Sequence, residues 1–210
     1  MTNLKRIRKQ REKRHAKIES MRHERLNLPF ASFVRLMPYM TEETTKSLQF
    51  IPTPSIFCKQ IVPQDLQLVT FGVLTQLQGA PKDNDYLKTC CNLVNVLTGV
   101  PTEVVATKKA IEVLGIVNMV QSEMERIGKL FQSLQTDKTS DELAAGIEKL
   151  EFGAFGILDW YAQRMGIIDH EEVFATPWAR IFQCMRIDHE NQEFEKRYRK
   201  IIETRNKLKK

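Results

Sequence analysis

Pairs of adjacent carboxylates are the most obvious candidates for catalysis in this sequence. They occur at Glu42–Glu43, Asp141–Glu142 and Glu171–Glu172, and two carboxylates in different environments can act as general acid and general base. Each pair, however, falls in the first turn of a predicted helix, where negative charge stabilises the helix dipole. We therefore interpret these pairs as helix-start residues.

His170 and His189 have acidic residues on both sides, a composition that could support a metal site. Neighbours along a helix point about 100° apart, so we favour a solvent-exposed face. Gly153 and Gly156 form a G-A-F-G sequence, but no predicted strand precedes it and no Lys-Ser/Thr follows it, as a phosphate loop requires. The sequence predicts no metal site, no cofactor and no enzyme.

The four cysteines show no C-x-x-C pair and no ligand spacing with the histidines. Cys90 and Cys91 are adjacent in a predicted helix and cannot face one another. We interpret the cysteines as small apolar side chains in a reducing cytosol.

Aromatic residues gather between positions 152 and 178. Aromatics at helical spacing usually belong to a core, which is the interpretation we favour. The alternative is an apolar groove between helices that binds a partner peptide or helix. The residues assigned to that groove are Trp160, Tyr161, Phe174 and Trp178.

Positive charge is concentrated at the two ends of the chain. Residues 1–25 carry ten Lys or Arg against three Glu, and residues 194–210 carry eight against two. Because the whole chain has a net charge of +6, residues 26–193 carry −7. Such basic segments bind polyanions or acidic surfaces. The residues assigned to this binding are Lys5, Arg6, Arg8, Lys9, Arg11, Lys13, Arg14, Lys17, Lys196, Arg197, Arg199 and Lys200.

Three interpretations of the N-terminal basic segment stay open. It is a solvated arm without function, it contacts nucleic-acid phosphates, or it docks onto an acidic protein surface. The last includes the body of another copy, so a homo-oligomer is one alternative. Residues 1–25 contain no aromatic residue, so base stacking is not predicted.

The elements that carry these residues are predicted to be helical from residue 63 on, because apolar residues recur at steps of three and four. We predict an all-α fold, a bundle of five or six helices. The predicted organisation is a basic arm over 1–26, an irregular Pro-punctuated wrapping segment over 27–62, a helical body over 63–193 and a basic helix end over 194–210. A short hairpin is predicted near 49–61.

Several helix boundaries follow from capping patterns. Pro63 suits a first helical position, and Ser140 is predicted to start a helix that continues to Gly166. Thr176-Pro177 is a strong start signal for the last helix. No apolar run approaches the ~20 residues that span a bilayer, and residues 1–25 lack the apolar region of a secretory signal. We expect no membrane contact.

Two groups of motifs resemble proteins of tailed bacteriophages. The first comprises residues 68–77 (LVTFGVLTQL) and 93–101 (LVNVLTGVP). The second comprises residues 158–166 (LDWYAQRMG), Thr176-Pro-Trp178 and residues 193–198. Over about residues 65–200 the chain is similar to small helical phage proteins, among them tail-assembly chaperones and virion components.

The resemblance implies a non-enzymatic protein that acts in virion or tail assembly, or as a structural part of the virion, through protein–protein contacts. Its partners would be phage structural or tail proteins, with genome DNA as a further partner of the basic arms. Its location would be the host cytoplasm during assembly, and the virion if it is structural. The alternative is a nucleic-acid-binding accessory protein that contacts phosphates through these arms. No catalytic residues are implied.

Overall fold

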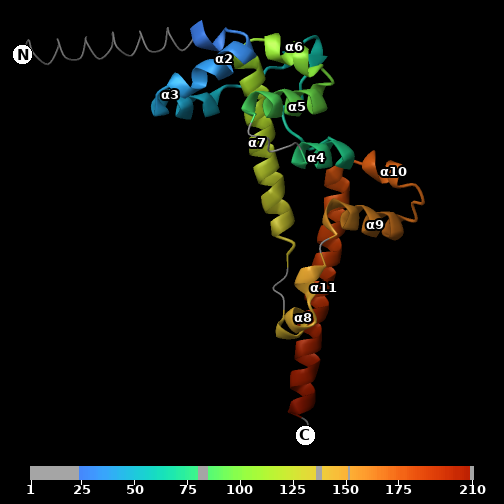
Figure 1. Cartoon of the computed structure of the whole chain (residues 1–210). Helices are drawn as coiled ribbons and strands as arrows, with labels where there is room; N and C mark the ends of the chain where they lie inside the picture. The colour runs from blue at the N-terminus through green and yellow to red at the C-terminus, as the bar shows by residue number, and fades with distance from the viewer. Residues whose placement is uncertain (1–23, 80–84, 136–138, 151, 209–210) are drawn as a thin grey trace, which may run out of the picture. The chain divides into compact units, whose positions relative to one another are not determined.

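The computed structural model describes residues 24–79, 85–135, 139–150 and 152–208. These residues are mainly helical and contain one two-stranded hairpin, which confirms the all-α class (Figure 1). The chain forms two compact units. The first contains the described residues up to Asp65 together with 79–123, and the second contains 66–78 and the described residues from Met124 on.

The first unit is built around the N-terminal part of a long helix. Its elements are α2 (Phe30–Leu36), α3 (Glu42–Ser47), β1 (Ile56–Phe57), β2 (Gln60–Ile61), α5 (Tyr86–Thr98), α6 (Thr102–Thr107) and the first part of α7 (Ala110–Gln132). The Phe30 N–H donates to the Lys108 carbonyl (2.7 Å) and the Ala110 N–H to the Leu28 carbonyl (2.9 Å). These bonds attach the segment before α2 to the start of α7.

The irregular segment between α3 and β1 contacts α7 closely. The Asn118 amide donates to the Leu48 carbonyl (2.7 Å), and the Thr53 hydroxyl donates to the Gly115 carbonyl (3.2 Å). A Cβ atom at Gly115 would lie 2.3 Å from the Pro52 carbonyl oxygen. Only glycine therefore permits this approach, because no side chain could occupy that space.

The second unit joins α4 to the C-terminal helices. Its elements are α4 (Phe71–Gln78), the end of α7, α8 (Ser140–Ala144), α9 (Gly153–Met165), α10 (His170–Phe174) and α11 (Trp178–Lys207). The Phe71 N–H donates to the Thr176 carbonyl (2.8 Å), and the Trp178 N–H donates to the Val69 carbonyl (3.2 Å). The starts of α4 and α11 therefore lie side by side.

Three predicted boundaries were wrong. The helix expected from Pro63 begins at Phe71, because residues just before it bond to the start of α11 instead. The helix expected over 140–166 is divided into α8, a 3-10 turn (Ile147–Lys149) and α9. Gly146 and Gly153 interrupt it with φ of +82° and +53°. The predicted hairpin is present but only over Ile56–Ile61, since Leu48–Phe50 is a 3-10 turn. Thr176-Pro177 does precede the last helix.

Candidate functional site

A third of the predicted basic surface, four of its twelve residues, lies in the described part of the chain. Lys5 to Lys17, the residues assigned to the N-terminal arm, lie outside the described residues. Lys196, Arg197, Arg199 and Lys200 are exposed on α11. Figure 1 shows α11 continuing past α8 toward the C-terminus without another described element of its unit alongside it.

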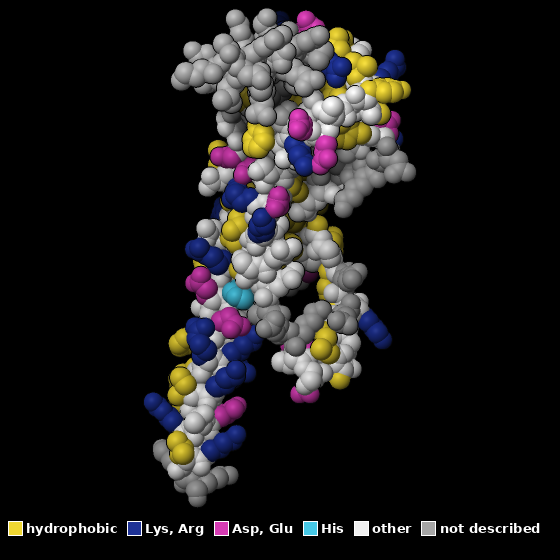
Figure 2. All heavy atoms as spheres, turned by 90° about the vertical axis from the view of Figure 1, so that its left-hand side faces the viewer, with side chains coloured by type: hydrophobic (Ala, Val, Ile, Leu, Met, Phe, Trp, Pro, Cys, Tyr) yellow, Lys and Arg dark blue, Asp and Glu magenta, His cyan; other side chains and the backbone are white. Residues whose placement is uncertain are grey.

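The C-terminal part of α11 also carries an exposed apolar stripe. It consists of Ile187, Phe194, Tyr198 and Ile201 of the helix and Leu208 directly after its last residue, with exposed fractions that run from 48% at Ile187 to 83% at Leu208. We call these five residues the α11 stripe. Figure 2 shows hydrophobic side chains along one edge of this helix end, with several Lys and Arg side chains and a few acidic ones beside them. Apolar side chains that share one exposed helix face indicate a contact surface.

The α11 stripe lies on the opposite face from the residues that anchor α11 in its unit. At the start of the helix Trp178, Ile181 and Phe182 are buried. Phe194 follows Trp178 by sixteen residues and Ile201 follows Ile181 by twenty, which are rotations of about 160° and 200° at about 100° per residue. The residues that bury the start of α11 therefore pack against the other side of the helix and do not cover the stripe.

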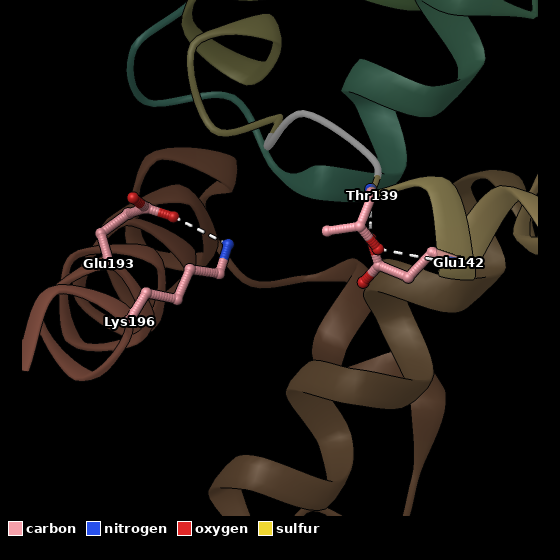
Figure 3. A network of polar contacts seen from close by, with 4 residues as sticks. All are labelled: Thr139, Glu142, Glu193 and Lys196. Carbon is pink, nitrogen blue, oxygen red and sulfur yellow. Dashed lines mark hydrogen bonds and ion pairs between the residues drawn. The ribbon is translucent and has the colours of Figure 1, made fainter. Parts of the chain in front are cut away.

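The face opposite the stripe is cationic and looks toward α8. Lys196 extends from α11 toward the start of α8, where Thr139 and Glu142 cap the helix (Figure 3). The Thr139 N–H donates to the Glu142 carboxylate (2.8 Å), and this bond is the main cause that lowers the pKa of Glu142. The nearby Lys196 adds to that lowering. Lys196 also pairs with Glu193 (2.9 Å).

The aromatic cluster is divided between core and surface: Tyr161 and Trp178 are buried, whereas Phe152 and Phe155 are exposed. Tyr161 is almost fully buried, and Phe174 stacks on Phe71 with ring centroids 6.2 Å apart. The buried Trp178 donates its indole N–H to the Leu66 carbonyl (2.6 Å). Of the four residues predicted to form a partner groove, Trp160 lines one, Tyr161 and Trp178 are buried in the core, and Phe174 is half-buried against Phe71.

Trp160 lines an open groove between α9 and α11 with a volume of about 430 Å³. Its other walls include Phe152, Ile157, Met185 and His189. The Arg164 guanidinium lies 5.7 Å from the Trp160 ring centroid and pairs with Asp188, which also lines the groove and raises the pKa of Arg164. The groove is mainly apolar, and its charged residue Asp188 is already paired with Arg164.

The three carboxylate pairs considered for catalysis lie on three different helices, α3, α8 and α10. His170 Nε2 lies 4.0 Å from Asp159 Oδ1 of α9. Within the described ranges, no group of three His, Cys, Asp or Glu is arranged to hold a metal ion. None of the described helices combines the length and the apolar character needed to cross a bilayer.

The α11 stripe was not predicted from the sequence, although counting residues along the helix from Ile181 to Ile201 reveals its opposite phase. Comparison of the chain with known protein families, curated proteins and solved structures finds no significant match.

Proposed function

We propose that this protein is a non-enzymatic assembly protein that binds a partner protein through the C-terminal part of α11. The observation that supports this proposal is the exposed α11 stripe on the helix face opposite the buried anchor. An isolated helix gains little stability from exposed aromatic and branched residues, whereas an amphipathic helix commonly buries such a face against a partner.

The setting of this assembly rests on the sequence resemblance. It is the virion or tail of a tailed phage, with phage structural or tail proteins as partners and the host cytoplasm as the place of assembly. Mass spectrometry of purified particles separates the two roles. A structural component is present at a fixed copy number, and an assembly chaperone is absent from finished particles.

A second candidate function is binding of nucleic acid by the basic ends. It is favoured by Lys196, Lys200 and Lys207, which share one face of α11. Filter binding at 50 and 200 mM salt tests it, because binding that engages several phosphates weakens by orders of magnitude over this range. Deletion of residues 1–25 should then reduce the salt dependence, and unchanged binding after deletion would exclude a role for that segment.

Site-specific photo-crosslinking tests the main proposal. A benzoylphenylalanine replaces Phe194 on the stripe or, as a matched control, Glu203, which lies nine residues away on the opposite helix face. The full-length variants are irradiated in the cells that make the protein. We expect a discrete protein adduct at position 194 and none at 203.

Other outcomes of this experiment are equally informative. Adducts with nucleic acid at either position would favour the second candidate. Absence of any protein adduct at position 194, with the variant still folded, would contradict the main proposal.

A further inference from the structure

The α11 stripe has the spacing of a helix-pairing seam. Ile187, Phe194, Ile201 and Leu208 follow one another at intervals of seven. Asn191, Tyr198 and Arg205 come four residues after the first three of them. Alternating steps of four and three produce the 3.5-residue repeat along which two helices pack side by side. The seam is therefore apolar at one core position and contains a polar residue, Asn191, and a charged one, Arg205, at the other.

The charge of this helix end argues against a second copy as the occupant of the seam. Residues 194–208 contain six Lys or Arg against two Glu. In a parallel pair of copies Arg205 would meet Arg205, and in an antiparallel pair the two cationic segments would still overlap. Like charges facing one another across such a seam favour different partners over identical ones.

Arg205 also argues against a lipid surface. It lies eleven residues after Phe194, so it points only about 20° away from Phe194, within the apolar face. Insertion of this face into a bilayer would carry the guanidinium toward the hydrocarbon, which is unfavourable. A partner helix can instead place a carboxylate opposite Arg205, where the guanidinium can form two parallel hydrogen bonds with it.

The surface beside Arg205 suits such a carboxylate. A shallow hollow there is lined by Lys200, Ile201, Thr204 and Arg205. A partner side chain entering it would meet an apolar side chain and two cations, since the Thr204 hydroxyl already donates to the Lys200 carbonyl. This combination matches an acidic side chain that emerges from an apolar helix face.

We propose that the partner is an acidic amphipathic helix of another protein. It pairs along the α11 stripe with apolar residues at its own seam positions, a carboxylate opposite Arg205 and a further acidic residue beside Arg197. This inference rests on the proposed protein-binding function of α11 and specifies the chemistry of its partner.

Fluorescence anisotropy with the full-length chain and a designed probe tests the pairing. The probe is a labelled peptide of four heptads with Leu at the seam, Glu at the flanks and one Glu opposite Arg205. A second peptide has Lys in place of that one Glu. We expect saturable binding of the first peptide, and its loss when Phe194 and Ile201 are replaced by Ser.

Charge reversal supplies the decisive comparison. Arg205→Glu should weaken binding of the first peptide about tenfold or more and should restore binding to the Lys-containing peptide. Lys207→Glu, the same change on the opposite face, should weaken binding less than about threefold, because screened charges at that distance interact weakly. Circular dichroism of each variant verifies that the helix is retained.

Four results would overturn the inference. These are no binding of the acidic peptide, equal effects of Arg205→Glu and Lys207→Glu, self-association of the chain that Ile201→Ser abolishes, and stripe-dependent binding to anionic vesicles. A protein adduct at position 194 without binding of the acidic peptide would leave the proposed function standing and remove only this partner. Loss of both the adduct and peptide binding would remove the proposed function itself.

Discussion

The first part of α7 and the last part of α11 are both helical and both carry bulky aliphatic residues, yet their environments are opposite. In α7, Val113, Ile116 and Val120 are buried, and the helix is apolar on several faces. In α11, Ile201 and Leu208 lie on one exposed face and charged residues occupy the others. The spacing of apolar residues therefore specifies a helix in both places. Whether the apolar face of that helix is buried depends on other residues of the chain that pack against it.

Matched isoleucine substitutions should produce the largest difference between the two regions. Ile116→Ala on α7 removes a fully buried side chain and should lower the free energy of unfolding by about 2–5 kcal/mol. Ile201→Ala on α11 should change it by less than about 0.5 kcal/mol, because its side chain is half exposed. Urea denaturation followed by circular dichroism measures both, and equal losses would show that the α11 stripe is covered within the chain.

Two glycines of α7 sharpen the same contrast within one helix. Gly115→Ala places a methyl group against the Pro52 carbonyl and should destabilise the protein by about 1–3 kcal/mol. Gly128→Ala meets nothing within 4 Å and should stabilise it by about 0.5–1 kcal/mol, because alanine restricts the unfolded chain more. Thermal unfolding of the two variants should shift in opposite directions. A stabilising Gly115→Ala would mean that the segment around Pro52 does not contact α7.

The burial of Cys90 in α5 should make the stability of the protein depend on pH. Burial raises the pKa of this thiol to about 12, with the neighbouring Cys91 thiol contributing to the rise. The unfolded thiol ionises near pH 9 and the folded one does not, so stability is retained below pH 9. It falls as pH rises above 9, by up to about 1.4 kcal/mol per pH unit.

Urea denaturation between pH 8.5 and 10.5 measures this slope. Cys90→Ala should reduce the slope without abolishing it, because burial also raises the pKa of the Cys91 thiol, to about 11. If Cys90→Ala left the slope unchanged, a residue other than Cys90 would be responsible for the loss of stability above pH 9. In the native state Cys90 should also react with iodoacetamide far more slowly than the half-buried Cys58.

The smallest effect concerns an exposed position whose backbone is strained. Cys58 and Lys59 form the turn of the hairpin with φ of +50° and +69°, a conformation that glycine adopts more easily than other residues. Lys59→Gly should raise the free energy of unfolding by about 0.5–1 kcal/mol, and Lys59→Ala should leave it nearly unchanged. If Lys59→Gly instead lowered the temperature of thermal unfolding, the left-handed conformation of this turn would be contradicted.

Helix starts were predictable where local chemistry sets them. Ser140 is the first residue of α8, and Pro177 directly precedes α11, as the capping patterns implied. Residues before α4 were mispredicted because Val69 bonds to the start of α11 more than a hundred residues away. The residues next to Val69 in the sequence do not indicate a hydrogen-bond partner so far along the chain.

The amino-acid sequence alone determined the helical class, the acidic body with its basic ends, and the absence of any motif with catalytic spacing. These properties depend on composition and on periods of three or four residues, which are local. Tertiary structure alone decided that Tyr161 and Trp178 are core while Trp160 lines a groove, and that the α11 stripe is uncovered. Covering a side chain requires atoms from elsewhere in the fold, so its exposure is fixed only when the helices pack.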